Sequence, residues 1–193
     1  MRDQNNLYAK DKELVNKVLR GDRGAFATII KNTEALVTTI VFKMIQDNRD
    51  REDLVQDIFL KAYHNLPGFR HEAKLSTWIG QISYHTCLHH IEKKRPISVE
   101  AHEETISKDQ GSLSNSTGQW LYRKDLAGIL KTETAKLPPL YQTLLTLFHL
   151  EEMSVDEIRQ ITGLPEGTIK SYLYRARIQL KERLLSNYEK EDL

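Results

Sequence analysis

The stretch Ser154–Leu184 reads SVDEIRQITGLPEGTIKSYLYRARIQLKERL, and its pattern predicts two helices separated by a tight turn. Ser154 is a favourable N-cap, and Glu157, three positions later, completes a capping box for a helix Val155–Thr162. The Gly-Leu-Pro that follows interrupts this helix, because glycine and proline both disfavour a helix interior. A second helix is therefore expected from about Glu166.

The second helix has two distinct faces. Apolar residues recur at helical spacing and predict a core face: Ile169, Leu173, Ala176, Leu180 and Leu184. The opposite face is polar and basic. This is the layout of a helix-turn-helix, whose second helix enters the DNA major groove with its N-terminal residues reaching base edges. The candidate DNA contacts are Glu166, Gly167, Thr168, Lys170, Ser171, Tyr174, Arg175 and Arg177. A helical hairpin with an ordinary solvated basic face remains the alternative.

Helical periodicity extends over most of the chain, which predicts an all-α fold. One clear example is the apolar stripe in DREDLVQDIFLKAY, formed by Leu54, Val55, Ile58, Phe59 and Ala62. β-branched residues do not alternate between turn signals as they would in strands. Residues 96–119 instead carry Pro, Gly, Ser and Asn, with more acidic than basic residues and no apolar period, which predicts a flexible linker. The expected organisation is a domain at 1–95, a linker at 96–119 and a second domain at 120–193.

Composition restricts the class of protein further. The 193 residues include 28 basic and 27 acidic ones, so a preference for an acidic or basic partner must come from charge placement. A single cysteine, Cys87, excludes an internal disulfide. The polar start MRDQNNLYAKDKE does not resemble a signal peptide. No uninterrupted apolar run approaches the ~18 residues of a membrane span. We expect a soluble cytoplasmic protein.

The stretch Leu75–Arg95, LSTWIGQISYHTCLHHIEKKR, is the other informative segment. On a helix, Cys87 points away from His85 and His89, and no CxxC pair exists to complete a zinc site, so neither metal nor cofactor is expected. The same divergence argues against a catalytic Cys–His pair and against an enzyme. Aromatic and basic residues in and before this helix could instead bind a single nucleic-acid strand.

DREDLVQDIFLKAY, STWI and LPEGTIKSYLYRAR occur in this order. Together they resemble the extracytoplasmic-function group of bacterial RNA polymerase sigma factors. The resemblance runs from GDRGAF to KERL and implies a subunit that binds core polymerase and directs it to promoters. It implies region 2 in the first domain and region 4, which reads the −35 element, in the second. It also implies an anti-sigma partner, no small-molecule substrate and no membrane insertion.

The resemblance assigns two further surfaces. The outward positions of one helix would dock on the polymerase clamp: Asp53, Gln56, Asp57, Leu60 and Lys61. The melted −10 strand would contact the residues Phe69, Arg70, His71, Lys74, Ser76, Thr77, Trp78, Gln81, His85, Lys93, Lys94 and Arg95. Gln81, His85, His89 and Tyr172 depart from residues common in the family, which affects the expected promoter sequence rather than the function. A one-component helix-turn-helix regulator is the alternative function.

Overall fold

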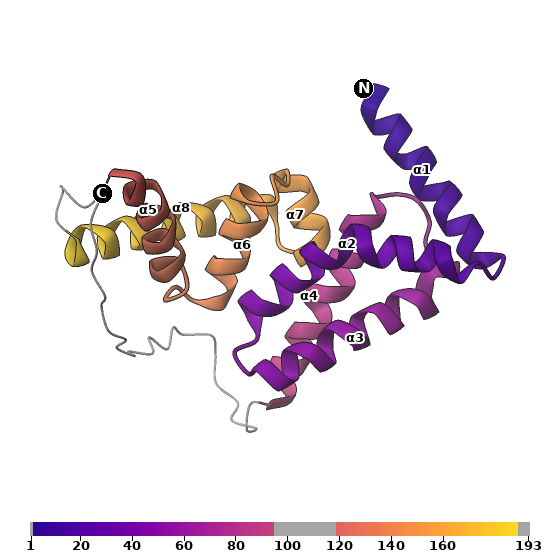
Figure 1. Ribbon diagram of the computed structural model, residues 1–193, viewed down its shortest axis with the longest axis horizontal. Coiled ribbons are helices and arrows are strands. Elements are labelled where there is room, and N and C mark those ends of the chain that lie inside the picture. The colour runs from indigo at the N-terminus through magenta and orange to yellow at the C-terminus, as the bar shows by residue number, and fades with distance from the viewer. Residues whose placement is uncertain (1, 95–118, 189–193) are drawn as a thin grey trace.

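The computed structural model describes residues 2–94 and 119–188, and over these residues it contains helices and turns but no strand. An N-terminal group contains α1 (Arg2–Leu19), α2 (Arg23–Met44), α3 (Asn48–Asn65), the 3-10 helix η1 (Leu66–Gly68) and α4 (Leu75–Lys94). A C-terminal group contains α5 (Gln119–Thr134), α6 (Pro139–His149), α7 (Val155–Thr162) and α8 (Glu166–Asn187) (Figure 1). The prediction of an all-α protein is confirmed. The expected linker lies outside the described residues, apart from Gln119, where α5 begins.

The central helix of the N-terminal group is α2, which packs against α1, α3 and α4. Asp22 caps it by accepting a hydrogen bond from the Ala25 amide at 3.1 Å, and Asp47 caps α3 in the same way through the Arg49 amide at 2.9 Å. Acidic caps satisfy amides that have no partner within the helix. The two caps set where these helices begin, and their apolar faces then meet in one core.

By length and composition, α2 is the one helix among the described residues that could cross a membrane. In this fold it has a different role, because eight of its side chains are buried: Ala25, Ile29, Thr33, Leu36, Val37, Ile40, Val41 and Met44. A helix that is apolar on several sides is also what the centre of a helical core requires. The apolar composition of α2 is explained by the helices that pack around it.

In the C-terminal group, the boundaries of the helix-turn-helix agree with the sequence prediction. The Ser154 hydroxyl accepts from the Glu157 amide at 3.2 Å, and the Glu157 carboxylate accepts from the Ser154 amide at 2.9 Å. At the other end of α7, Gly163 adopts a φ of 73°, a left-handed conformation that glycine adopts without steric cost. The predicted capping box and helix stop are confirmed.

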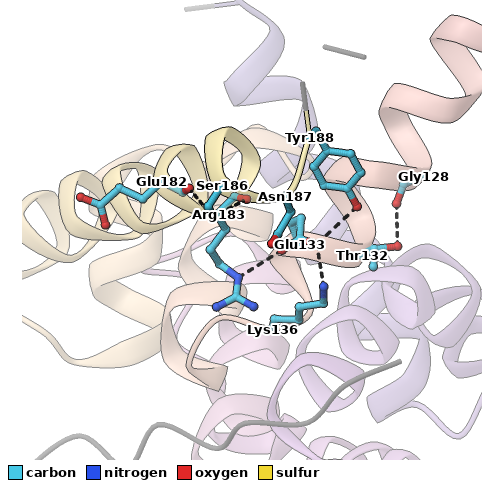
Figure 2. A network of polar contacts seen from close by, with 9 residues as sticks. All are labelled: Gly128, Thr132, Glu133, Lys136, Glu182, Arg183, Ser186, Asn187 and Tyr188. Carbon is cyan, nitrogen blue, oxygen red and sulfur yellow. Dashed lines mark hydrogen bonds and ion pairs between the residues drawn. The ribbon is translucent and has the colours of Figure 1, made fainter. Parts of the chain in front are cut away.

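A buried carboxylate joins α5 to α8. Glu133 is fully buried, and its side chain accepts from Lys136 at 2.6 Å and from Arg183 Nε at 3.2 Å. Asn187 and Tyr188 add longer hydrogen bonds of 3.4 Å (Figure 2). Burial by itself would raise the pKa of Glu133, but the hydrogen bonds and charges of Lys136 and Arg183 lower it overall. The carboxylate is therefore ionised and holds the end of α8 against α5.

The two groups of helices also pack against each other. α7 lies on α4, and α6 lies on α2 (Figure 1). The Thr39 hydroxyl donates to Glu151 at 3.2 Å, and Lys74 forms an ion pair with Glu157 at 2.6 Å. The buried residues of both groups form one continuous hydrophobic cluster.

Candidate nucleic-acid interface

The exposed face of α8 is the first candidate surface. Ile169, Leu173 and Ala176 are buried against the rest of the helix-turn-helix. The opposite face is open to solvent: Lys170, Ser171, Tyr174 and Arg175 are all exposed, and Tyr174 retains 64% of its accessible surface. The face therefore offers two cations, an aromatic ring and a hydroxyl, which suit phosphate and base-edge contacts.

The exposed cation in the first turn of α8 already has a carboxylate partner. Lys170 Nζ lies 2.5 Å from Glu166 Oε1, and both side chains are about three-fifths exposed. Gly167 is exposed and Thr168 is half-buried. The Lys170 ammonium must therefore exchange a carboxylate for a phosphate when it binds DNA, an exchange that costs little at an exposed site.

Arg177 is placed differently from the expectation. Its guanidinium lies over the Phe148 ring, 5.4 Å from the centroid, and Nε donates to His149 Nε2 at 3.3 Å. Burial, followed by the charge of Arg177, lowers the pKa of His149, so the imidazole is neutral and accepts this hydrogen bond. Arg177 thus ties α8 to α6, and it can reach DNA only by leaving these contacts.

The later part of the expected core face is only half-buried. Leu180 and Leu184 line a shallow apolar groove of about 230 Å³ together with Leu185, Arg177 and Lys181. The regular spacing predicted burial for both leucines. Burial is incomplete because no described residue fills this groove.

The second candidate surface is the outer side of α4 and the loop before it. Gln81 and His89 are exposed, and Trp78 and His85 are half-buried, and their spacing of three and four residues places all four along one side of the helix. A cavity of about 430 Å³ opens beside Trp78 and Gln81 and is also lined by Gly68, Phe69, Arg70, Glu72, Ala73 and Gln160. The tryptophan therefore has one packed side and one side towards this cavity.

Two residues expected to contact a strand are instead buried. Phe69 is 8% exposed, and its ring lies 5.1 Å from Trp78 and 4.6 Å from His71. Thr77 is 1% exposed, and its hydroxyl has no hydrogen-bond partner among the described residues. Phe69 therefore packs against Trp78 and contributes only a small part of the cavity wall, and Thr77 presents almost no surface to nucleic acid.

The remaining polar residues in and before α4 differ in their exposure to solvent. Arg70 and Lys93 are exposed, while Ser76 and His71 are half-buried. Lys94 is paired with Asp50, whose carboxylate also contacts His90 Nε2 at 3.2 Å. The hydrogen bond from Lys94 keeps the pKa of Asp50 below its ordinary value. Arg95 lies outside the described residues.

A third surface lies on α3, away from the core. Leu54, Ile58, Phe59 and Ala62 are buried and Val55 is half-buried, as the apolar stripe predicted. Asp53 and Gln56 are exposed, Leu60 keeps 59% of its surface, and Asp57 pairs with Lys61 at 2.7 Å.

Two further aromatic residues are exposed near the two ends of α3, and the sequence pattern did not single them out. Tyr63, one turn beyond Leu60, is 46% exposed and packs against Phe26 at 4.9 Å. Phe42 lies at the other end, beside the first turn of α3, and is 48% exposed with the Arg51 guanidinium 4.6 Å above its ring.

Cys87 is fully buried, and burial raises the pKa of its thiol to about 12, slightly opposed by the charge of Lys61. The thiol is therefore protonated at neutral pH and is a poor nucleophile and a poor metal ligand. Across residues 2–94 and 119–188, no group of three His, Cys, Asp or Glu side chains is placed to hold a metal ion.

The fold and these surfaces define an all-helical DNA-binding protein with a C-terminal helix-turn-helix. Residues 29–97 match the family model described as Sigma-70 region 2, and residues 128–180 match Sigma-70, region 4. The chain belongs to the extracytoplasmic-function (ECF) RNA polymerase sigma factors.

Individual relatives agree with this assignment. The chain is 30% identical over 173 residues to the ECF RNA polymerase sigma-E factor of Escherichia coli K12, covering 86% of this chain and 90% of that one. It is 27% identical over 179 residues to the ECF RNA polymerase sigma factor SigW of Bacillus subtilis, covering 90% and 96%. Among solved structures, CnrH in complex with the cytosolic domain of CnrY superposes with a TM-score of 0.64 at 19% identity, covering 92% and 99% of the two chains. That structural likeness supports the fold.

Proposed function

We propose that this sigma factor binds core polymerase through α3, reads duplex −35 DNA through α8 and holds the melted −10 strand on α4. The supporting observation is the order of the two matched regions together with the open polar face of α8, where Lys170, Ser171, Tyr174 and Arg175 are all exposed. The domains are assigned as 1–95 and 120–193, joined by the segment 96–119. The protein acts in the cytoplasm and performs no chemistry of its own.

For polymerase, the proposed contact is the outward face of α3 around Leu60 and Asp57. Leu60 gives an apolar centre, and Asp53, Gln56 and the Asp57–Lys61 pair surround it with polar groups. An exposed apolar residue within a polar rim is the usual anatomy of a protein interface. Tyr63 extends the apolar centre by one turn.

On the −10 side, the proposed contacts are Arg70, Lys74, Trp78, Gln81, His85 and Lys93. Trp78 offers the stacking surface that single strands require, and the exposed cations offer phosphate contacts. Phe69 keeps the Trp78 ring in place at 5.1 Å.

Energetics favour a specificity subunit over an autonomous DNA-melting protein. Opening about a dozen base pairs gives up stacking of ~1.4 kcal/mol per step, or roughly 17 kcal/mol. Stacking on Trp78 and His85 at ~1–3 kcal/mol each returns at most ~6 kcal/mol. The remainder must come from polymerase contacts, so this chain is proposed to select promoters only as part of a holoenzyme.

An anti-sigma protein is the proposed inhibitory partner. The CnrH structure is a complex with CnrY, and a second similar structure is the sigma factor RpoE of Bartonella quintana with the anti-sigma factor NepR, at a TM-score of 0.60 and 20% identity. Inhibition of this chain by a related protein is inferred from these complexes.

The test is run-off transcription on fragments of genomic DNA, with core polymerase in the presence or absence of this chain. Discrete transcripts are expected only when both are present. Arg175→Ala should reduce the yield of transcripts that start at sites with a −35 element, and Lys12→Ala, at an exposed position of α1, serves as the control. If core polymerase gives the same transcripts without the chain, the proposed function is wrong.

A further inference from the structure

The first amide of α4 is capped by a residue from another helix. Asp11 lies on α1, and its Oδ2 atom accepts a hydrogen bond from the Leu75 amide at 3.0 Å, although the two residues are 64 positions apart in the chain. A carboxylate at this place satisfies an amide that has no partner within its own helix, and its charge suits the positive end of the helix dipole. Asp11 therefore caps a helix to which it is not adjacent in sequence.

The residue at the N-cap position of α4 cannot provide this hydrogen bond. The Lys74 carbonyl accepts from the Trp78 amide at 3.0 Å, which identifies Lys74 as the N-cap. A lysine side chain has donors but no acceptor, so it cannot bind an amide. The Lys74 ammonium is instead paired with Glu157 at 2.6 Å. Among the described residues, the side-chain acceptor for the start of α4 comes from α1.

The same helix also contacts the other end of the loop that precedes α4. The loop, Phe69–Lys74, begins where the Phe69 amide donates to the Leu66 carbonyl of η1 at 3.1 Å. α1 packs against η1 and bonds to Leu75, so it holds the loop at both ends. Because Phe69–Lys74 forms much of the wall of the cavity beside Trp78, the position of α1 affects the shape of that cavity.

One residue of the loop has a backbone conformation that requires such support. His71 has a φ of 58°, in the left-handed region, which is unfavourable for residues other than glycine. A conformation of this kind persists only where the surrounding structure holds the chain on both sides. η1 provides one anchor and Asp11 the other, so loss of the cap should let the loop relax.

The capped turn also carries the aromatic ring assigned to the −10 strand. Trp78 follows Leu75 by three residues, and its ring packs on Phe69 of the loop at 5.1 Å. Leu75 is 3% exposed, so the start of α4 is fixed twice, by the Leu75 side chain in the core and by its amide on Asp11. A strand that stacks on a ring already held in place loses less free energy to ordering than one that meets a frayed helix end.

We propose that Asp11 is a positioning residue for −10 recognition. By capping α4 from α1, it holds the loop Phe69–Lys74 and the Trp78 ring in the arrangement that receives the unpaired strand. The proposal rests on the assignment of α4 to the −10 strand. Asp11 acts through the Leu75 amide rather than through contact with DNA.

The first experiment tests the cap in the free chain by hydrogen exchange measured by NMR. The Leu75 amide should exchange about fivefold faster in Asp11→Ala than in wild type, the factor that corresponds to a typical helix cap. Asp11→Asn should keep most of the protection, because asparagine caps about as well as aspartate. Glu13→Ala is the control, because it removes the same charge from an exposed position of α1, where Glu13 pairs with Lys17. Equal exchange of Leu75 in wild type and Asp11→Ala would overturn the proposal.

The second experiment measures strand binding by the holoenzyme. Core polymerase with each variant is titrated with a single strand that contains the −10 region of a promoter found by run-off transcription, and separately with the −35 duplex of that promoter. Asp11→Ala should lower strand affinity about three- to tenfold and leave duplex affinity within about twofold of wild type. The fold of α1 should be retained, because alanine is the best helix former. An equal loss of both affinities would mean that Asp11 only stabilises the fold, and the proposal would be wrong.

Two conservative variants separate the geometry of the cap from its charge. Asp11→Asn removes the charge but keeps an oxygen at the same distance from the backbone, so strand affinity should stay within about twofold of wild type. Asp11→Glu keeps the charge but moves the carboxylate by one methylene, so it should bind the strand more weakly than Asp11→Asn. If Asp11→Ala does not fold, this order decides. Binding by Asp11→Glu as tight as that by Asp11→Asn would contradict a role in capping.

Arg70→Ala distinguishes failure of this inference from failure of the proposed function. Arg70 is an exposed cation assigned to the strand directly. If Arg70→Ala weakens strand binding and Asp11→Ala does not, the inference is overturned and the proposed function stands. If neither variant weakens it, the assignment of this surface to the −10 strand is wrong, and the role of Asp11 is refuted with it.

Discussion

Removing Glu133 should destabilise the C-terminal helices more than removing a surface carboxylate. Its side chain is fully buried, and Lys136 and Arg183 both direct their charges at it (Figure 2). Glu133→Ala leaves both cations without this partner. Breaking a fully buried pair costs about 3–5 kcal/mol, but Lys136 and Arg183 are 35% and 38% exposed, so water can solvate them in part.

We therefore expect a decrease in stability of about 2 kcal/mol, close to that of one charge-assisted hydrogen bond. With an m-value of about 2 kcal/mol/M, the midpoint of urea unfolding followed by circular dichroism should fall by about 1 M. Glu182→Ala is the control, because Glu182 is an exposed acid of α8 that points away from the network (Figure 2). It should move the midpoint by less than about 0.25 M.

The pH dependence gives an independent check. The folded-state pKa of Glu133 is lowered, so its stabilisation is complete above the unfolded-state pKa of about 4.3 and is lost as the pH falls through the folded value. The difference between wild type and Glu133→Ala should therefore narrow in acid. Equal midpoints of the two proteins at neutral pH would refute the reasoning, as would a difference that stays constant down to the lowest pH at which both fold.

Three further predictions concern function. Asp57→Arg should weaken co-elution with core polymerase and leave helical content intact, because the Asp57 side chain lies on the surface, where it pairs with Lys61. Unchanged co-elution would remove α3 from the interface. Arg175→Ala and Lys170→Ala should each weaken binding to duplex DNA. If the lost side chain contacts a phosphate, the slope of log binding constant against log salt concentration should fall by about one. Wild-type slopes in both variants would mean that neither side chain of α8 contacts the DNA backbone. Asp50→Asn should release Lys94 and raise affinity for a pre-melted promoter about twofold in low salt, an increase that disappears in Asp50→Asn/Lys94→Ala if it acts through Lys94.

Local sequence determined the helices and their ends. The capping box at Ser154 and Glu157 and the left-handed Gly163 set the bounds of α7 through interactions between residues at most four apart. Periodicity likewise determined which side of α3 and of the first half of α8 is apolar. Both signals act within a few residues, so a single sequence contains all of the information needed.

Tertiary packing decided which of the exposed-looking polar and aromatic residues are free. Phe69 packs against Trp78, Lys94 forms an ion pair with Asp50, and Arg177 donates a hydrogen bond to His149. The Lys94–Asp50 and Arg177–His149 partners lie 44 and 28 positions apart in the chain. Helical spacing says which residues share a side, but not which helix covers that side.

The same reason explains why the packing of α7 on α4 could not be foreseen. From the sequence alone, Gly80 is a residue of low helix propensity and Glu157 is a capping residue. In the folded chain α7 packs on α4. There Gly80 leaves room for the Ile161 side chain, and Glu157 forms an ion pair with Lys74. Short-range pattern determines the helices of this sigma factor, whereas interactions between residues more than 80 positions apart decide which of its binding surfaces are covered, because chain separation has no bearing on distance once the helices pack.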